Sequence, residues 1–152
     1  RFETKGVSNG VTLIDDYGHH PVEIKAALKA GRMLSGNHKL IAVVQPHRYS
    51  RLADLFADFC SCFNDADEVL VADIYAAGEA PIDGADKASL VAGLRDHGHK
   101  AAAGLDGPDT LAAEIAARTS EGDVVMCLGA GDITAWAAAL PHQLDKLAGE
   151  SA

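Results

Sequence analysis

Cysteine, aromatic residues and positive charge are all scarce in this chain of 152 residues. Its three cysteines, Cys60, Cys62 and Cys127, are an odd number without a C-x-x-C pair. That pattern favours reduced thiols in a cytoplasm over a secreted disulfide framework. Thirteen Lys and Arg stand against twenty-two Asp and Glu, a net charge of −9, so a general nucleic-acid or anionic-membrane surface is disfavoured. Any anion must therefore be bound by a local basic cluster.

Long hydrophobic runs and phosphate-binding loops are also missing. The longest apolar runs have the length of a strand, far short of the roughly 20 residues that cross a bilayer, so we expect a cytoplasmic protein without a membrane span. No G-x-x-x-x-G-K-[ST] motif occurs, and the turn at 129–131 has only two of the three glycines of a dinucleotide fingerprint. His97 and His99 have no third ligand nearby in the sequence, so we expect them to face solvent and predict no metal site.

What the chain does have is an alternation of strand-like and helix-like segments, in a composition that is 48% apolar. Its length and composition indicate one compact domain with its own core. The expected strands are 2–7 and 11–14, which form a hairpin, then Leu40–Val44, 68–73, 99–103 and Val124–Leu128. The expected helices begin at Pro21 and cover 50–63 with Ser50 as cap, 86–94, 109–118, and 133–147 with a kink at Pro141. This alternation predicts a Rossmann-like, three-layer α/β domain with a mostly parallel sheet and an N-terminal β-hairpin.

Polar side chains follow the predicted strands at the points where each strand ends. The segments are Asp-Asp-Tyr-Gly-His-His-Pro at 15–21, Gln-Pro-His-Arg-Tyr-Ser-Arg at 45–51, residues 73–81, which lead into a long loop at 74–85, and Gly-Ala-Gly-Asp at 129–132. Ligands of open parallel sheets bind outside the carboxyl ends of the strands. We therefore expect these loops to form one site for a small polar ligand.

The first of these loops places two histidines at the start of a helix. Free N–H groups and the helix dipole disfavour an imidazolium there, so a neutral His19 or His20 can donate to a ligand oxygen. Asp16 is an acceptor suited to a sugar hydroxyl or an ammonium group. The alternative is that His20 and Asp16 only cap the helix and the turn.

The second loop carries the basic cluster that the negative net charge requires. Residues 52–86 contain no Lys or Arg and nine acids, so Arg48 and Arg51 form an isolated positive region. Three residues apart across a helix start, both can converge on one carboxylate or phosphate. The alternative is that they pair with the nearby acids. In the third loop, Tyr75 and Glu79 could close over a ligand, or the glycines and Pro81 could simply shape a long turn.

These motifs, with Tyr-Ala-Ala-Gly-Glu-Ala-Pro-Ile at 75–82 and Gly-Ala-Gly-Asp-Ile at 129–133, closely resemble the C-terminal domain of the Mur ligase family. The likeness is to the branch that joins L-alanine to UDP-N-acetylmuramate, and it spans the whole chain. Ser50 and Leu52 stand where many relatives have Thr. The resemblance implies that residues 1–152 are the third domain of a longer enzyme, after a UDP-binding domain and an ATPase domain with the P-loop. A start at Arg1 without Met agrees with this expectation.

By resemblance, the reaction is ATP-dependent amide formation in peptidoglycan precursor synthesis, for which L-alanine, UDP-N-acetylmuramate and ATP are the partners. ATP and Mg²⁺ would be held mainly by the central domain, so none is expected on this domain and the domain alone is expected to be inactive. The resemblance assigns Asp16 to the nucleotide. It assigns the substrate side to seven residues: Tyr17, His19, His47, Arg48, Arg51, Tyr75 and Glu79. No residue is assigned as catalytic.

Two other functions remain open from the sequence. A signalling receiver domain also has an Asp pair after its first strand and another Asp after a later one, here Asp73. Such a domain would need a Lys after the last strand, which residues 129–133 lack, and it would leave Arg48 and Arg51 unexplained. The second alternative is a non-catalytic module that binds a small molecule.

Overall fold

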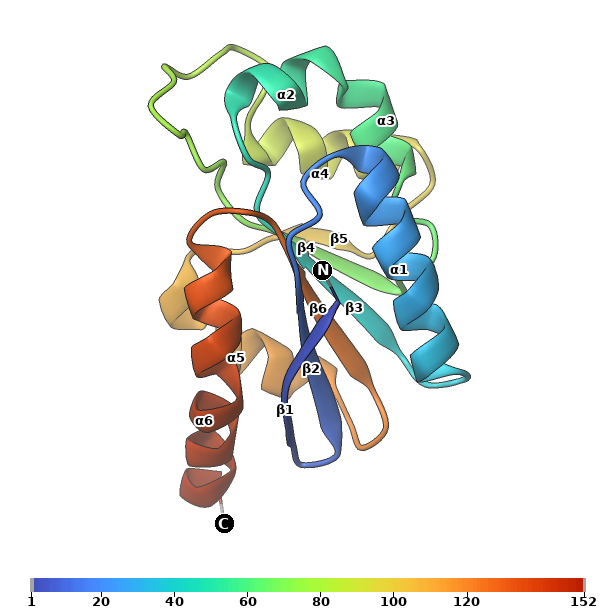
Figure 1. Cartoon of the computed structure of the whole chain (residues 1–152), viewed down its shortest axis with the longest axis vertical. Helices are drawn as coiled ribbons and strands as arrows, with labels where there is room; N and C mark the ends of the chain where they lie inside the picture. The colour runs from blue at the N-terminus through green and yellow to red at the C-terminus, as the bar shows by residue number, and fades with distance from the viewer. Residues whose placement is uncertain (1, 152) are drawn as a thin grey trace.

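A six-stranded sheet covered by helices on both faces organises the chain. The computed structural model describes residues 2–151, and Figure 1 shows their arrangement. The elements in chain order are β1 (Glu3–Ser8), β2 (Val11–Asp16), α1 (Pro21–Ser35), β3 (Leu40–Val44), α2 (Tyr49–Asp54), α3 (Phe56–Ser61), β4 (Glu68–Val71), α4 (Lys87–Asp96), β5 (Ala102–Gly104), α5 (Pro108–Arg118), β6 (Val124–Leu128) and α6 (Ile133–Ser151). The strand order is β1-β2-β6-β3-β4-β5, and only the β1–β2 pair is antiparallel. The predicted three-layer α/β fold with an N-terminal hairpin is confirmed.

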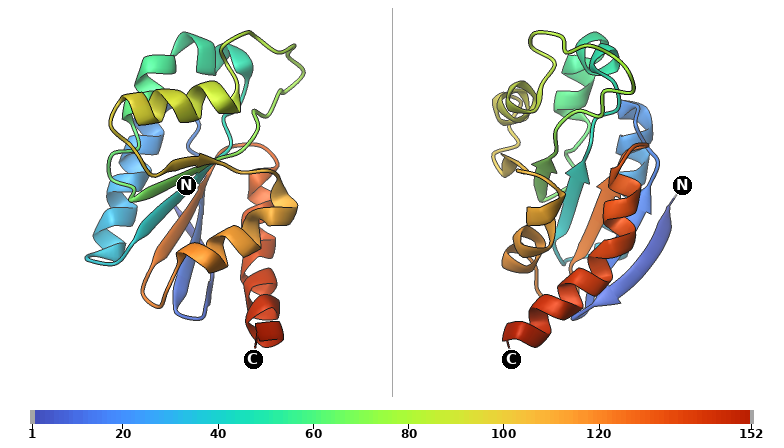
Figure 2. Two further views of the ribbon diagram at one scale, coloured as in Figure 1. Left: turned by 180° about the vertical axis from the view of Figure 1, so that it is seen from behind. Right: turned by 90° about the vertical axis from the view of Figure 1, so that its left-hand side faces the viewer.

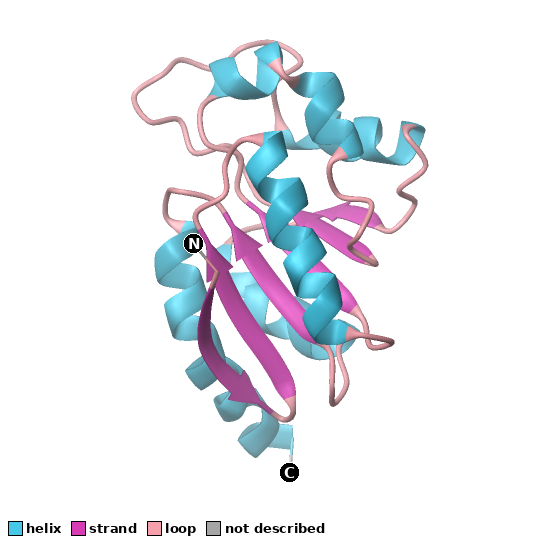
Figure 3. Cartoon of the chain, turned by 45° about the vertical axis from the view of Figure 1, so that its right-hand side comes forward, coloured by secondary structure: helices cyan, strands magenta, loops and turns pink. Residues whose placement is uncertain are grey.

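The two faces of the sheet are covered by different helices. Every residue of β3 and β6 is buried, as expected for strands with helices on both sides. One core cluster joins the sheet to α1, α3 and α4 through side chains such as Leu28, Phe59 and Leu94. The other joins it to α5 and α6 through side chains such as Ile115 and Leu140. Figure 3 shows α1 in front of the sheet, with α5 and α6 behind it.

The predicted helix at 50–63 is wrong as a single element. It is divided into α2 and α3 at Leu55, whose φ of −117° and ψ of 26° leave the helical region. Ser50 is not the cap of α2. The N-cap residue is Arg48, and the side chain of Arg48 makes no capping hydrogen bond. The N–H of Ser50 instead donates to a carboxylate from a distant loop, that of Glu79, at 3.0 Å. Periodicity within one segment could not reveal that outside partner.

Several other boundaries differ from the prediction. The strand expected at 68–73 ends at Val71, and the strand expected at 99–103 begins at Ala102. His99 uses Nε2 to contact the carbonyl oxygen of Ala66 at 2.7 Å, so only His97 of the two histidines is exposed to solvent as expected.

The hairpin and the last helix are both longer than predicted. The second hairpin strand continues to Asp16, and the pairing register shifts between Thr4 and Gly6. A Cβ at Gly6 would lie 3.0 Å from Pro141 Cγ, so the glycine permits close contact between β1 and α6. Helix α6 continues through Pro141 to Ser151. None of the described helices combines the length and apolarity that a bilayer crossing requires.

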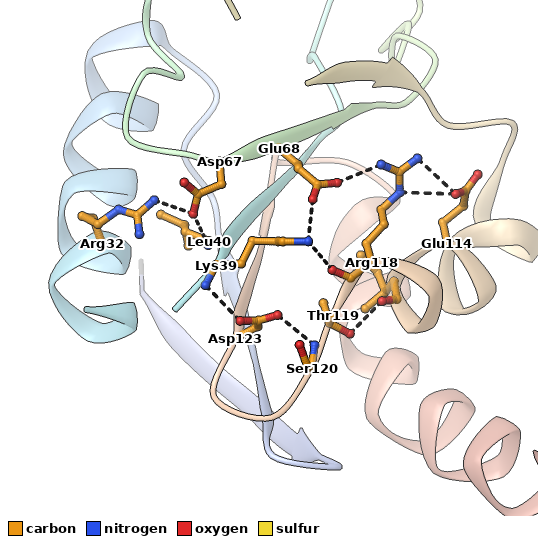
Figure 4. Close-up of polar contacts among 11 residues, drawn as sticks. Arg32, Lys39, Leu40, Asp67, Glu68, Glu114, Arg118, Thr119, Ser120 and Asp123 are labelled. Carbon is orange, nitrogen blue, oxygen red and sulfur yellow. Dashed lines mark hydrogen bonds and ion pairs between the residues drawn. The ribbon is translucent and has the colours of Figure 1, made fainter. Parts of the chain in front are cut away.

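An ionic network joins α5 to the amino ends of β3 and β4 (Figure 4). Glu68 lies between two cations, with Lys39 Nζ at 2.7 Å and Arg118 Nη1 at 2.9 Å from its carboxylate oxygens. Asp67 accepts the N–H of Leu40 at 2.8 Å and pairs with an arginine of α1. The network therefore fixes the end of the sheet opposite to the polar loops.

Replacing Glu68 with glutamine should lower the free energy of unfolding at neutral pH by about 1.5–3 kcal/mol, the usual worth of hydrogen bonds between charged groups. Burial raises the pKa of Glu68, but hydrogen bonds from Lys39 and Arg118 outweigh it and hold the pKa below its usual value. Because the pKa of Glu68 is lower in the folded state, its ionised carboxylate stabilises the folded domain at pH values above 4.5, its pKa in the unfolded chain. This stabilisation is lost as the pH falls through the folded-state pKa.

Urea unfolding of both proteins at neutral pH and at acidic pH tests this expectation. The difference in stability should shrink on the acid side, and a difference independent of pH would contradict the assignment. Glu114→Gln is the matched control, because Glu114 pairs with Arg118 only from the next turn of the same helix, at 3.3 Å. Such a pair contributes only about 0.2–0.5 kcal/mol.

Candidate functional site

Four polar loops meet at the carboxyl edge of the sheet. Their strands β2, β6, β3 and β4 are adjacent and parallel, so the chain leaves all four in the same direction. Backbone bonds continue the sheet into the loops: Gly129 N–H donates to Asp16 O at 3.1 Å, and Gln45 N–H donates to Leu128 O at 3.0 Å. Figure 2 shows the long loop after β4 beside α2 at this end of the molecule. The predicted convergence of the loops is confirmed.

A row of three rings connects three of these loops. The rings of His47 and Tyr75 are stacked, with centroids 5.2 Å apart and planes at 17°. The ring of His19 lies beside that of His47, with centroids 5.9 Å apart and planes tilted by 51°. The backbone strengthens the join, because Tyr75 N–H donates to Pro46 O and Arg48 N–H donates to Tyr75 O, both at 2.8 Å. Three predicted site residues are therefore brought together.

His47 also holds one of the two arginines. Arg51 Nη1 donates to the carbonyl oxygen of His47 at 2.7 Å and lies 3.3 Å from its Nδ1. Partial burial and the charges of Arg51, His19 and Arg48 lower the pKa of His47 from its usual 6.5. The imidazole is thus neutral at physiological pH and adds no third positive charge.

Arg48 stands at the start of α2 in a strained conformation. Its φ of +78° lies in the left-handed region, which a non-glycine residue rarely adopts and which is concentrated at functional sites. Its side chain is half exposed, with Nη1 4.0 Å from Glu79 Oε2. Arg48 and Arg51 line one open cavity of about 360 Å³ together with Ser50, Asp54 and Leu55. Two arginines that line one cavity suit a carboxylate or a phosphate group.

The first loop is held by its own polar side chains. Asp16 Oδ1 accepts the N–H of Gly18 at 2.8 Å. His20 Nδ1 accepts the N–H of Val22 at 3.2 Å, and Glu23 accepts the N–H of His20 at 3.1 Å, which completes a capping box. Asp16 therefore stabilises the turn, and His20 caps α1. Tyr17, in contrast, leaves 43% of its surface exposed at this edge.

Two residues of this edge escaped the sequence-based prediction. Gln45 is only 4% exposed, and its Oε1 accepts the N–H of Ile133 at 3.1 Å, which ties β3 to the start of α6. A Cβ at Gly131 would lie 2.6 Å from Tyr75 Cγ, so the ring packs directly on that glycine. A polar residue directly after an apolar strand was the available signal for Gln45. Nothing in the sequence indicated the contact at Gly131.

The acidic residues do not form the arrangement of a receiver domain. Asp73 is largely exposed and pairs with Lys87 at 3.3 Å, while Asp16 is engaged in its own turn. Among residues 2–151, no three His, Cys, Asp or Glu side chains are grouped so that they could hold a metal ion. The carboxyl edge is therefore dominated by arginine, neutral imidazole and tyrosine.

Comparison with known proteins identifies the family of this chain. The family model described as Mur ligase, glutamate ligase domain, matches residues 1–131. The chain belongs to the Mur ligase family. It is 60% identical over 151 residues to the UDP-N-acetylmuramate–L-alanine ligase of Rhodospirillum centenum, a match that covers 99% of this chain and 31% of that protein. The ligase of the same name from Methylobacterium radiotolerans is 62% identical over 144 residues, 95% of this chain and 31% of that protein.

A solved structure extends the likeness of this Mur ligase domain to three dimensions. The UDP-N-acetylmuramate–alanine ligase of Thermotoga maritima superposes with a TM-score of 0.74 at 25% identity, over 100% of this chain and 30% of that chain. The chain thus spans about a third of the length of the curated relatives that it matches.

Proposed function

We propose that this chain, residues 1–152, is the C-terminal domain of a UDP-N-acetylmuramate–L-alanine ligase, an ATP-dependent enzyme of peptidoglycan precursor synthesis in the cytoplasm. The observation that carries the proposal is the 60% identity to a ligase of that name over 99% of the chain. The carboxyl edge supports it, because two arginines line one open cavity there and the rings of His19, His47 and Tyr75 lie together at the same edge. A carboxylate-bearing amino acid fits that chemistry.

The proposed reaction forms an amide from a carboxylate and an amine. ATP phosphorylates the muramoyl carboxylate, the amine of L-alanine attacks the acyl phosphate, and phosphate leaves. In this domain we assign Arg48 and Arg51 to the carboxylate of L-alanine. Neutral His47 keeps Arg51 in place without competing for the anion.

The remaining site residues complete the wall of the cleft in this proposal. Tyr17, His19 and Tyr75 line the substrate side, and Asp16 lies next to the nucleotide. Because the described residues provide no grouped metal ligands and the chain has no P-loop, we assign Mg²⁺ and the ATP phosphates to another domain.

Assays of the chain alone and of the complete enzyme test the proposal. The 152-residue chain should neither hydrolyse ATP nor form an amide, because it has no P-loop to hold the phosphates of ATP. The complete enzyme should release phosphate from ATP only when UDP-N-acetylmuramate and L-alanine are both present. Turnover by the chain alone, or an enzyme that is indifferent to L-alanine, would overturn the proposal.

A further inference from the structure

A tight turn in the loop after β4 brings Glu79 to the arginines. Glu79 N–H donates to Ala76 O at 3.0 Å, and the two residues between them have positive φ, 51° at Ala77 and 87° at Gly78. Consecutive left-handed residues give the backbone a sharp reversal of the type I′ kind. The reversal directs the side chain of Glu79 to the start of α2.

Both carboxylate oxygens of Glu79 are used within the protein. Oε1 accepts the N–H of Ser50 at 3.0 Å, and Oε2 accepts the hydroxyl of the same serine. Arg48 Nη1 lies 4.0 Å from Oε2. The hydrogen bonds from Ser50, followed by the charge of Arg48, hold the pKa of Glu79 below its usual value. The carboxylate is therefore ionised and engaged by side chains of α2 and its cap.

These contacts replace the cap that α2 lacks. The helix has only six residues and no capping bond from its own N-cap side chain. The strained backbone of Arg48 is restrained by its N–H bond to Tyr75 and by the ion pair with Glu79. Strained conformations persist only where surrounding contacts over-determine them. Loop 75–79 therefore fixes the segment that carries both arginines.

We infer that Glu79 is a positioning residue, which closes loop 75–79 onto α2 and thereby directs Arg48 and Arg51 toward the amino-acid carboxylate. This inference rests on the proposed function, and it replaces direct substrate contact as the role of Glu79. The carboxylate acts through Ser50 and Arg48 and touches neither L-alanine nor nucleotide.

Kinetics of the complete enzyme test this role. Glu79→Ala should raise the KM for L-alanine about tenfold or more and leave the KM for ATP within about twofold, because small misplacements of a binding group are costly. Glu79→Gln should recover part of the loss, since its amide oxygen still accepts the N–H of Ser50. Ser50→Ala should also raise the KM for L-alanine, and the double variant Ser50→Ala/Glu79→Ala should lose less than the sum of the two.

Additive effects of the two substitutions would show that Glu79 acts independently of Ser50 and would overturn the inference. Asp86→Ala is the matched control, because Asp86 caps α4 through the N–H of Ser89 at 2.8 Å. Its loss removes a carboxylate cap elsewhere in the domain. The KM for L-alanine should therefore stay unchanged.

Hydrogen exchange separates this inference from the proposed function. In the same enzyme, Glu79→Ala should speed exchange in the peptide that covers residues 48–54, with the peptide that covers Val124–Leu128 unchanged. If exchange at 48–54 becomes faster but the enzyme does not use L-alanine, the proposed function is rejected, while the role of Glu79 in holding α2 is supported. If exchange at 48–54 is unchanged, Glu79 does not hold α2 in place, and the inference is overturned whether or not the enzyme is active.

Discussion

Replacing Arg48 or Arg51 with alanine in the complete enzyme should raise the KM for L-alanine by about 10- to 100-fold. A hydrogen bond to a charged group is worth about 1.5–3 kcal/mol, and each 1.4 kcal/mol is a factor of ten. Arg48 and Arg51 line the same open cavity, so in the proposed function each contributes to holding one carboxylate. The KM for ATP should change far less. Lysine should restore only part of the loss, because a point charge does not reproduce a bidentate fork.

Arg95→Ala provides the control for these two variants. Arg95 lies in α4, where its Nε donates to the carbonyl oxygen of Ala102 at 3.0 Å. Its removal should leave both KM values unchanged. If the Arg48 and Arg51 variants also keep normal kinetics and lose at most about 1 kcal/mol of stability, the arginines serve only surface ion pairs. That result would rule out the assignment of Arg48 and Arg51 to the carboxylate of L-alanine.

Gly129→Ala should destabilise the domain by about 2–4 kcal/mol and disorganise the carboxyl edge. Gly129 has a φ of +152°, and a Cβ there would lie 2.8 Å from the carbonyl oxygen of Gln45 and 2.9 Å from a methyl group of Ile133. A strained φ costs about 1–3 kcal/mol, and the contact with backbone adds to it because backbone cannot move aside cheaply. At about 2–4 °C per kcal/mol for a domain of this size, the thermal midpoint should fall by roughly 4–16 °C.

Gly98→Ala isolates the conformational part of that effect. Gly98 also has a positive φ, +96°, but a Cβ there would have no neighbouring atom within 4 Å. Its thermal midpoint should therefore fall by less than that of Gly129→Ala. Equal losses in the two variants would show that the close packing of Gly129 against Gln45 contributes nothing.

Local sequence determined the layers of this protein and the place of its site. The unbroken apolar runs of β3 and β6 could only be strands buried on both faces, because a helix of five residues would expose part of such a run. Parallel strands end at one edge, so the residues after each strand had to meet there. His19, His47, Arg48 and Tyr75 were therefore predictable as neighbours before any coordinates. The resemblance of the same loop motifs to those of Mur ligases indicated the family.

Tertiary structure alone decided how those neighbours are held. The engagement of Glu79 by Ser50 is a contact between residues 29 positions apart, which no pattern within one segment encodes. The same is true of Gln45 and Ile133, which are 88 residues apart. Periodicity reports which side of an element is buried, whereas the partner of a polar group depends on which loops the sheet brings together. The sequence thus specified the chemistry of the carboxyl edge, and the packing of its loops specified which side chains remain available to a ligand.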